Sequence, residues 1–166
     1  MLKSIINLTK NPQQEQQPCS MSCVPTCLAM AFGVGPQQVV DDMTQIGIHI
    51  TTGLDRRQEC FYLSRKGIGS QRFLNCDGIG LLQGHYLIEV PSLNRVRVVH
   101  CLYMHINDYG PTVFDPNKGR GVVAYDTSSV SALPIISVTK LDDFSDLLAV
   151  ASTPPTEEIA EHVLLR

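Results

Sequence analysis

The chain changes abruptly at Cys23 from a polar, glutamine-rich segment to an apolar helical pattern. Ser22 is a good N-cap residue, and Pro25 is tolerated in a first helical turn. Helix-forming residues follow at 28–31, and the two glycines of Gly33-Val34-Gly35 end the pattern. The sequence therefore predicts a helix whose first or second residue is Cys23.

The position of Cys23 favours a reactive thiol. The N-terminus of a helix carries a partial positive charge that stabilises a thiolate, and a neighbouring imidazolium would lower the thiol pKa further below its usual value of about 8.5. Cys27 lies inside the same helix and is expected to be a core residue. Cys23 is either a nucleophile or, like Cys27, a small residue of the core.

Length and composition indicate a globular protein. The 166 residues suffice for one domain, expected at 1–152, with a C-terminal tail at 153–166 that begins at Thr153-Pro154-Pro155. The net charge of -3 gives no electrostatic reason to expect a nucleic-acid partner. No apolar run approaches the roughly 18 residues of a membrane span, so none is predicted. No secretory signal is recognisable, which favours a cytoplasmic protein or one exported without a classical signal, such as a secreted effector.

The six cysteines are irregularly spaced and are expected to be reduced. Cys19, Cys23 and Cys27 recur every four residues, which on one continuous helix would form a stripe of thiols. Pro18 and the N-cap at Ser22 argue against a helix through Cys19, and no nearby histidine completes a zinc site. We therefore expect no metal and no other cofactor.

The apolar pattern changes from helical to strand-like after Gly67. Helices are predicted at 23–32, 36–46 and 54–66. Short segments rich in β-branched and aromatic residues predict strands at 71–75, 86–90, 96–106, 112–115, 122–125 and 135–139. A closing helix is predicted at 141–150. Helices followed by strands predict an α+β fold, with N-terminal helices packed on an antiparallel sheet.

Strand periodicity selects His100 among the five histidines. The even positions of 96–106 are apolar except for His100, and the odd positions include the more polar Arg97 and His105. His100 is therefore expected to point toward the first helix and His105 away from it. His85 is a further candidate, expected to act on substrate binding if at all.

Asp115 is the expected partner of His100. The residues 107–110 form a turn, and a symmetric hairpin pairs Ile106 with Pro111 and places Asp115 on the His100 face, with α-carbons about 7 to 8 Å apart. A carboxylate on an apolar face is unfavourable without a partner. Thiol, imidazole and carboxylate together predict a catalytic set. If Asp115 only caps the following turn, Asn117 would hold the ring instead.

An oxyanion would need hydrogen-bond donors near Cys23. The amide N–H of Cys23 has no partner in the first helical turn, and the side-chain amide of Gln17 lies six residues upstream. Gln17 is the predicted second donor, and the other glutamines of 13–17 compete with it for this role.

The sequence around Gln17, Cys23 and Pro25 resembles papain-like cysteine peptidase domains that process bacteriocin leader peptides. In these domains, which occur on peptide-exporting ABC transporters and as stand-alone relatives, Gln precedes Cys by six positions, Pro follows two positions after the Cys, and a Leu-Ala-Met helix continues, as at 28–30 here. Their second motif, a His opening an apolar strand and a later Asp-Pro before a glycine-containing turn, is similar to 100–104 and 115–119. The resemblance covers residues 14 to 150, approximately.

The resemblance implies a papain-like fold and a cysteine peptidase with Cys23 as nucleophile, His100 as base, Asp115 orienting His100, and Gln17 binding the oxyanion. It implies a peptide or protein substrate, cleaved after a double glycine, and association with a transporter or secretion system. The chain differs from the family at Ser22 and at Val24, where the family has Asp and Gly. A deamidase or transglutaminase with the same triad, and a non-catalytic peptide-binding module, are the alternatives.

Overall fold

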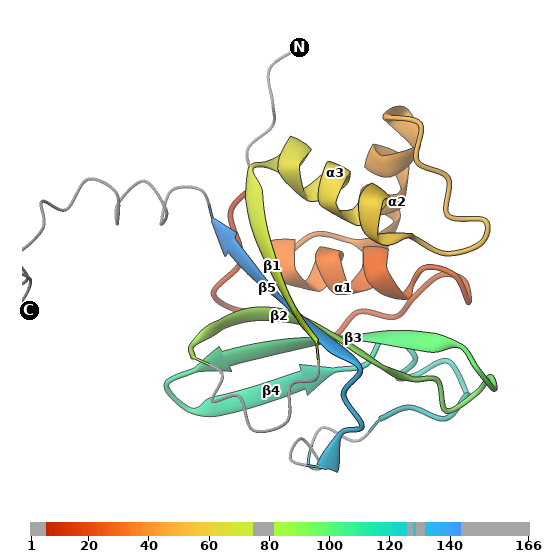
Figure 1. Ribbon diagram of the computed structural model, residues 1–166, viewed down its shortest axis with the longest axis vertical. Coiled ribbons are helices and arrows are strands. Elements are labelled where there is room, and N and C mark those ends of the chain that lie inside the picture. Colours follow the sequence, from red (N-terminus) through yellow and green to blue (C-terminus); the bar gives the residue numbers. More distant parts are fainter. Residues whose placement is uncertain (1–5, 75–81, 126–127, 129–131, 144–166) are drawn as a thin grey trace, which may run out of the picture.

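A computed structural model describes residues 6–74, 82–125, 128 and 132–143. Within these residues three helices precede five strands (Figure 1). The helices are α1 (Cys23–Phe32), α2 (Pro36–Gln45) and α3 (Arg56–Lys66), and the strands are β1 (Ile68–Leu74), β2 (Gly84–Pro91), β3 (Val99–Asn107), β4 (Gly110–Phe114) and β5 (Ser137–Asp143). The predicted α+β class, with N-terminal helices on an antiparallel sheet, is confirmed.

The helices begin and end close to the predicted residues. Cys23 is the first residue of α1, and Gly33 ends the helix in the left-handed conformation with φ 69°. Ser22 precedes α1, but its hydroxyl does not cap the helix, because it accepts from the Cys19 N–H and donates to the Cys19 carbonyl. α3 begins two residues later than predicted, since Asp55 and Gln58 form a capping box in front of it.

α1 is the central helix of the molecule. Its residues Pro25–Phe32 are all buried, and it lies between the sheet and the other two helices (Figure 1). Among the helices that the structure describes, none is by itself long and apolar enough to cross a membrane. α1 and α2 meet that criterion of length and composition only as a pair bent by 110°.

The sheet has the order β1-β5-β2-β3-β4, with antiparallel neighbours throughout. The last strand of the described chain, β5, is thus inserted between β1 and β2. Leu141 pairs with both neighbours and is buried, so the helix predicted to begin there is wrong for residues 141–143. The rest of that helix, 144–150, and the predicted tail 153–166 lie outside the described residues.

The predicted strand at 122–125 is wrong, because side chains occupy its backbone groups. The Val123 N–H and carbonyl bond to the side chain of Asn94, and the Tyr125 N–H donates to Asp115 Oδ2. The segment is therefore an irregular loop. Similarly, β3 begins at Val99 rather than at Val96, because residues 92–98 form a loop closed by the Ser92 N–H and the Val98 carbonyl.

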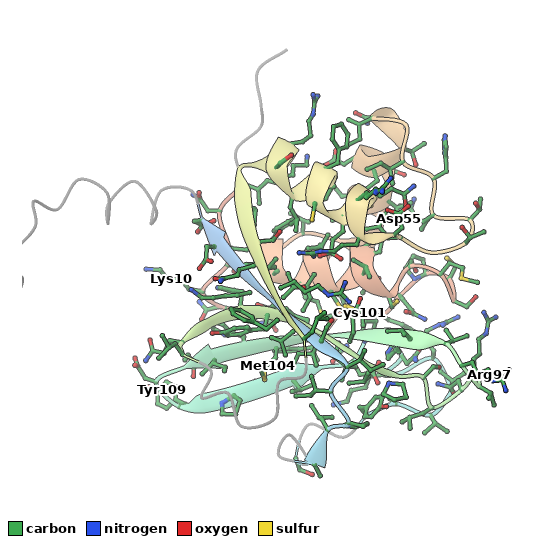
Figure 2. All side chains as sticks on the ribbon, viewed as in Figure 1. Lys10, Asp55, Arg97, Cys101, Met104 and Tyr109 are labelled. Carbon is green, nitrogen blue, oxygen red and sulfur yellow. The ribbon has the colours of Figure 1, made fainter. Side chains whose placement is uncertain are left out.

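Both faces of the sheet are covered. The odd-numbered Cys101 and Tyr103 of β3 belong to the core cluster that contains α1, whereas the even-numbered Leu102 and Met104 belong to a second cluster on the opposite face. Figure 2 shows Cys101 close to α1 and Met104 farther from it. The expectation that the even face packs on α1 is wrong, because loop residues such as Tyr125 bury that face instead.

The residues before α1 connect the ends of three elements. The Ile6 N–H donates to the carbonyl of Lys66 at the end of α3, and the Thr9 N–H donates to Ala31 in α1. The Leu8 N–H donates to the carboxylate of Asp143 at the end of β5, at 3.1 Å. This N-terminal arm, residues 6–9, holds the helical layer and the sheet together at one end.

Leu102→Ala tests the second cluster. Leu102 is fully buried, so its truncation is expected to lower the free energy of unfolding by about 2–5 kcal/mol. Urea denaturation measures the change. Val96→Ala is the control, because Val96 is 90% exposed and its truncation should change stability by less than about 0.5 kcal/mol. Equal effects of the two changes would contradict the described second core.

Candidate active site

Cys23 lies where α1 begins, at the edge of the core. The first recorded backbone bond at this end of α1 runs from the Thr26 N–H to the Ser22 carbonyl at 2.9 Å. The N–H groups of a first helical turn, including that of Cys23, have no acceptor within the helix. The Cys23 side chain is partly buried and lines a cleft, so one side of the thiol is open to a ligand.

His100 joins Cys23 to Asp115. It is the second residue of β3, it is buried, and its Nε2 lies 2.7 Å from Asp115 Oδ1. The imidazole is also hydrogen-bonded to the side chain of Cys23. Since Nε2 bonds the carboxylate, Nδ1 is the ring nitrogen left for the sulfur. The three predicted residues therefore form one hydrogen-bonded series of thiol, imidazole and carboxylate.

The register of the β3–β4 hairpin explains how Asp115 reaches His100. Ile106 pairs with Pro111 as predicted, and Tyr103 pairs with Phe114. Asp115 follows directly after the last paired residue, so its side chain is no longer held by the strand pairing. It lies beside the beginning of β3, where His100 is.

Asp115 is an ionised carboxylate in a buried setting. Only 1% of the residue is exposed, and burial alone would raise its pKa. Its hydrogen bonds with His100 and with the backbone N–H groups of Asn117 and Tyr125 outweigh burial and lower the pKa below its usual value. Both carboxylate oxygens therefore have donors.

His100 is protonated at neutral pH in this arrangement. Burial would lower its pKa, but the hydrogen bonds to Asp115 and Cys23, together with the charges of both groups, raise the pKa to about 9. A raised imidazole pKa means that the protein stabilises the cation.

Gln17 lies on the same cleft as Cys23 and His100. Its backbone N–H donates to the Pro116 carbonyl at 2.9 Å, and its side-chain Nε2 donates to Asn117 Oδ1 at 2.9 Å. An amide nitrogen carries two hydrogens, so one remains available to a ligand in the cleft. Gln17 is 4% exposed, and within the described structure its Oε1 has no hydrogen-bond partner.

Asn117 is a further site residue, expected from the sequence only as a substitute for Asp115. Its Oδ1 accepts from Gln17, its backbone N–H bonds Asp115, and its Nδ2 lies 3.4 Å from His100 Nε2. It thus connects Gln17 to the histidine and carboxylate. An asparagine two residues after the aspartate, in Asp115-Pro116-Asn117, is the sequence signal that points to it. The bond from the Tyr125 N–H to Asp115 has no such signal, because a backbone group does not depend on the residue type.

The cleft has a volume of about 210 Å³. Gln17, Cys23, His100 and Asn117 line it, together with residues from the loops at 92–99 and 120–122. Asp115 lies behind His100. Val24, which stands where the resembling family has glycine, packs against the first core cluster, so its side chain is directed into the fold.

The other described histidines of the sheet form a separate group. His85 and His105 face each other across β2 and β3, with ring centroids 4.6 Å apart, and His85 Nδ1 bonds the Tyr103 hydroxyl. Burial, and then the charge of His105, lower the pKa of His85 to about 4, and burial lowers the pKa of His105. His105 is 8% exposed, so the expectation that it occupies a wet face is wrong.

The remaining thiols near α1 have different surroundings. Cys27 Sγ donates to the Cys101 carbonyl at 3.4 Å, and burial raises its pKa. The hydrogen bond with Cys27, and then burial, raise the pKa of Cys101. Cys19 is exposed and precedes the helix. Within the described ranges, no group of three or more His, Cys, Asp or Glu side chains is placed to hold a metal ion.

Iodoacetamide at pH 7 is expected to modify Cys23 at least about 100-fold faster than Cys27 or Cys101. Those two thiols are buried and have raised pKa values, whereas Cys23 lines a cleft and bonds an imidazolium. Peptide mass spectrometry of the folded protein over time measures the rates. Cys19 is the control for exposure alone, and His100→Ala should slow Cys23 but leave Cys19 unchanged. Similar rates for Cys23 and Cys27 would contradict the described site.

No protein-family model matches this chain, and no curated protein matches it. The family resemblance of the two motifs therefore stays a prediction. The case for a function depends on the geometry of Cys23, His100, Asp115 and Gln17.

Proposed function

We propose that the protein is a cysteine peptidase of papain-like fold, which hydrolyses a peptide or protein substrate by thiol acyl transfer. The observation that carries the proposal is the hydrogen-bonded series from Cys23, at the start of a helix, through His100 to the buried Asp115. A nucleophile, a base and a group that orients the base are the parts that this chemistry requires. An open cleft beside the thiol supplies room for a substrate.

In the acylation step, the Cys23 thiolate attacks the carbonyl carbon of the scissile amide. A carbon–sulfur bond forms, and the electron pair of the carbonyl moves to the oxygen. As the tetrahedral intermediate collapses, the carbon–nitrogen bond breaks and the His100 imidazolium gives its Nδ1 proton to the leaving amine. Asp115 holds Nε2, so that Nδ1 keeps facing the sulfur.

In the deacylation step, neutral His100 takes a proton from a water molecule while that water attacks the thioester. The carbon–sulfur bond then breaks, which releases a carboxylic acid product and restores the thiolate and the imidazolium. The reaction consumes water and needs no cofactor. Asp115 remains ionised throughout, because its donors keep its pKa low.

The oxyanion of each tetrahedral intermediate would be bound by the Cys23 N–H and by Gln17 Nε2. The first donor is fixed by the start of α1, and the second by the bond from Gln17 to Asn117. Losing one such donor typically lowers kcat by about 10²–10³-fold. The same residues could hydrolyse the side-chain amide of a glutamine. The product distinguishes the two reactions, because a peptidase cleaves the main chain and a deamidase leaves it intact. The predicted association with a transporter or secretion system belongs to the same proposal.

A peptide library derived from a proteome tests the function. The wild-type protein should cleave a subset of peptides, and Cys23→Ala and His100→Ala should each lower cleavage by at least about 10³-fold, because nucleophile and base act as a unit. Mass spectrometry identifies the products. His105→Ala is the matched control, since that histidine pairs with His85 away from the thiol, and it should keep most activity. Glutamine converted to glutamate without chain cleavage would contradict a peptidase and indicate a deamidase.

The pH dependence of kcat/KM tests the role of Asp115. His100 has a pKa of about 9, so kcat/KM should fall as the pH rises through about 9, where the imidazolium is lost. Asp115→Asn removes a hydrogen bond and a charge that raise this pKa. It should lower activity by about 10²–10⁴-fold and move the alkaline limb to lower pH.

Stability has to be followed at each pH. The raised pKa of His100 gives stability that is complete below about pH 6.5 and is lost as the pH rises through about 9. Activity is therefore measured well below the Tm found at that pH. An alkaline limb that is the same in Asp115→Asn and wild type would mean that Asp115 serves only the turn that follows it.

A further inference from the structure

Two guanidinium groups line the cleft that contains Cys23. They belong to Arg95, in the loop after β2, and Arg120, in the turn after β4, and no aspartate or glutamate lines the same cleft. The chain as a whole has a net charge of -3, so the cleft is positive on a negative protein. The His100 imidazolium is paired with the buried Asp115 carboxylate, so the charge open to a ligand is that of the two arginines.

Within the described part of the chain, no carboxylate neutralises the two arginines. Across residues 6–74, 82–125, 128 and 132–143, no carboxylate forms an ion pair with either guanidinium. Arg120 Nη1 lies 3.5 Å from Asn117 Oδ1, a neutral acceptor. The nearest buried acid, Asp115, already receives hydrogen bonds from His100 and from two backbone N–H groups. Since the two charges have no anionic partner among the described residues, an anion that enters the cleft can pair with them.

The loop that carries Arg95 is held in place beside the cleft. The side chain of Asn94 bonds both the carbonyl and the N–H of Val123, at 2.7 and 3.1 Å. The Ser92 N–H donates to the Val98 carbonyl at 2.8 Å, which closes the base of the loop. These bonds connect the loop 92–98 to the segment after Arg120, so both arginines are presented from one connected rim.

The cleft has the size and lining for part of an extended peptide. Its volume of about 210 Å³ is below the roughly 300–1,000 Å³ of pockets that enclose a whole small molecule. One or two substrate side chains fill such a space. Val98, Val99 and Val122 line it as well and supply an apolar wall for the stem of a side chain.

We propose that Arg95 and Arg120 make the cleft selective for a peptide that carries a carboxylate within one or two residues of the scissile amide. This inference rests on the proposed peptidase function and names its substrate class. Guanidinium groups bind carboxylates through paired, charge-assisted hydrogen bonds. The carboxylate belongs either to an aspartate or glutamate side chain or to the C-terminus of the substrate. Arg95 and Arg120 are binding residues for that group and take no part in the acyl transfer.

The selectivity is tested with two alkylating reagents of nearly equal size. Iodoacetate carries a carboxylate, and iodoacetamide is its neutral counterpart. The measured quantity is the rate of alkylation of Cys23 by iodoacetate divided by its rate with iodoacetamide. Peptide mass spectrometry at pH 7 and low salt gives this ratio for the wild type and for each variant. Coulomb attraction in water across about 6 Å predicts that each of Arg95→Gln and Arg120→Gln lowers the ratio about threefold, and the double variant about tenfold.

Three controls accompany this experiment. Arg97→Gln makes the same change of net charge in the same loop, and Figure 2 shows Arg97 at the outer end of that loop, so the ratio should stay constant. Arg120→Lys keeps the charge and should retain most of the ratio. Cys19 is exposed and does not share this cleft, so its ratio should be the same in every variant. Salt should reduce the wild-type ratio toward that of the double variant.

An unchanged ratio in the double variant would overturn the proposal, as would an equal fall in Arg97→Gln. Peptides found to be cleaved are then compared as glutamate and glutamine pairs, and as free acids and C-terminal amides, which separates the two sources of the carboxylate. The glutamate or free-acid member should have the higher kcat/KM, and the double variant should remove the difference. If the wild type cleaves no peptide while the alkylation ratio behaves as expected, the peptidase function fails and the anion selectivity of the cleft stands.

Discussion

The burial of α1 is the constraint on which the rest of the fold depends. Residues Pro25–Phe32 are buried on every side, so the helix has to be covered by the sheet on one side and by helices on the other. Each large apolar side chain that is fully buried contributes about 1.5–3 kcal/mol, and Leu28 and Met30 are among them. The first turn, with Cys23, reaches the cleft that His100 also lines. The need to bury the rest of the helix thus leaves the thiol at the edge of the core, where a ligand can reach it.

A second constraint is the buried charge of Asp115. An unpaired carboxylate at this depth would be unfavourable by several kcal/mol, and the fold compensates it with His100 and with two backbone N–H groups of the segment that follows β4. The backbone carbonyl of Asp115 also accepts from Gln14, and the Gln17 N–H donates to Pro116. Segments without regular structure are thereby fixed around the site by polar bonds. The proposed oxyanion donor and the proposed base belong to one network.

Local signals predicted the parts of the structure that local energetics determine. The start of α1 at Cys23 and its end at Gly33 follow from capping and turn preferences, and the pairing of Ile106 with Pro111 follows from the turn at 107–110. The His100 and Asp115 pair could be found in this way, because a hairpin makes it nearly local. The face of β3 that packs on α1 could not be predicted in this way. Both faces of the strand are apolar, and only the tertiary structure decides which one meets α1.

The errors outside the helices have a related cause. Val122–Tyr125 has the composition of a strand, but side chains of Asn94 and Asp115 take its backbone groups, and the sequence pattern does not show these side-chain bonds. The closing helix predicted from Leu141 is wrong at its start, because Leu141 fills the place between β1 and β2. The sequence also gives no sign that Arg95 and Arg120 share a cleft, because they come from separate loops and meet only in the folded chain.

The insertion of β5 between β1 and β2 has a consequence for how the molecule folds. The sheet has no continuous hydrogen bonding until residues 137–143 are present, and the bond from Leu8 to Asp143 spans 135 positions of the chain. Contacts of such long sequence separation slow folding, because the loop-closure entropy must be lost before they form. During synthesis, the thiol, the imidazole and the carboxylate all leave the ribosome before the strand that completes their scaffold. Residues 137–143 therefore have to be in place before β1 and the strands that position His100 and Asp115 form one sheet.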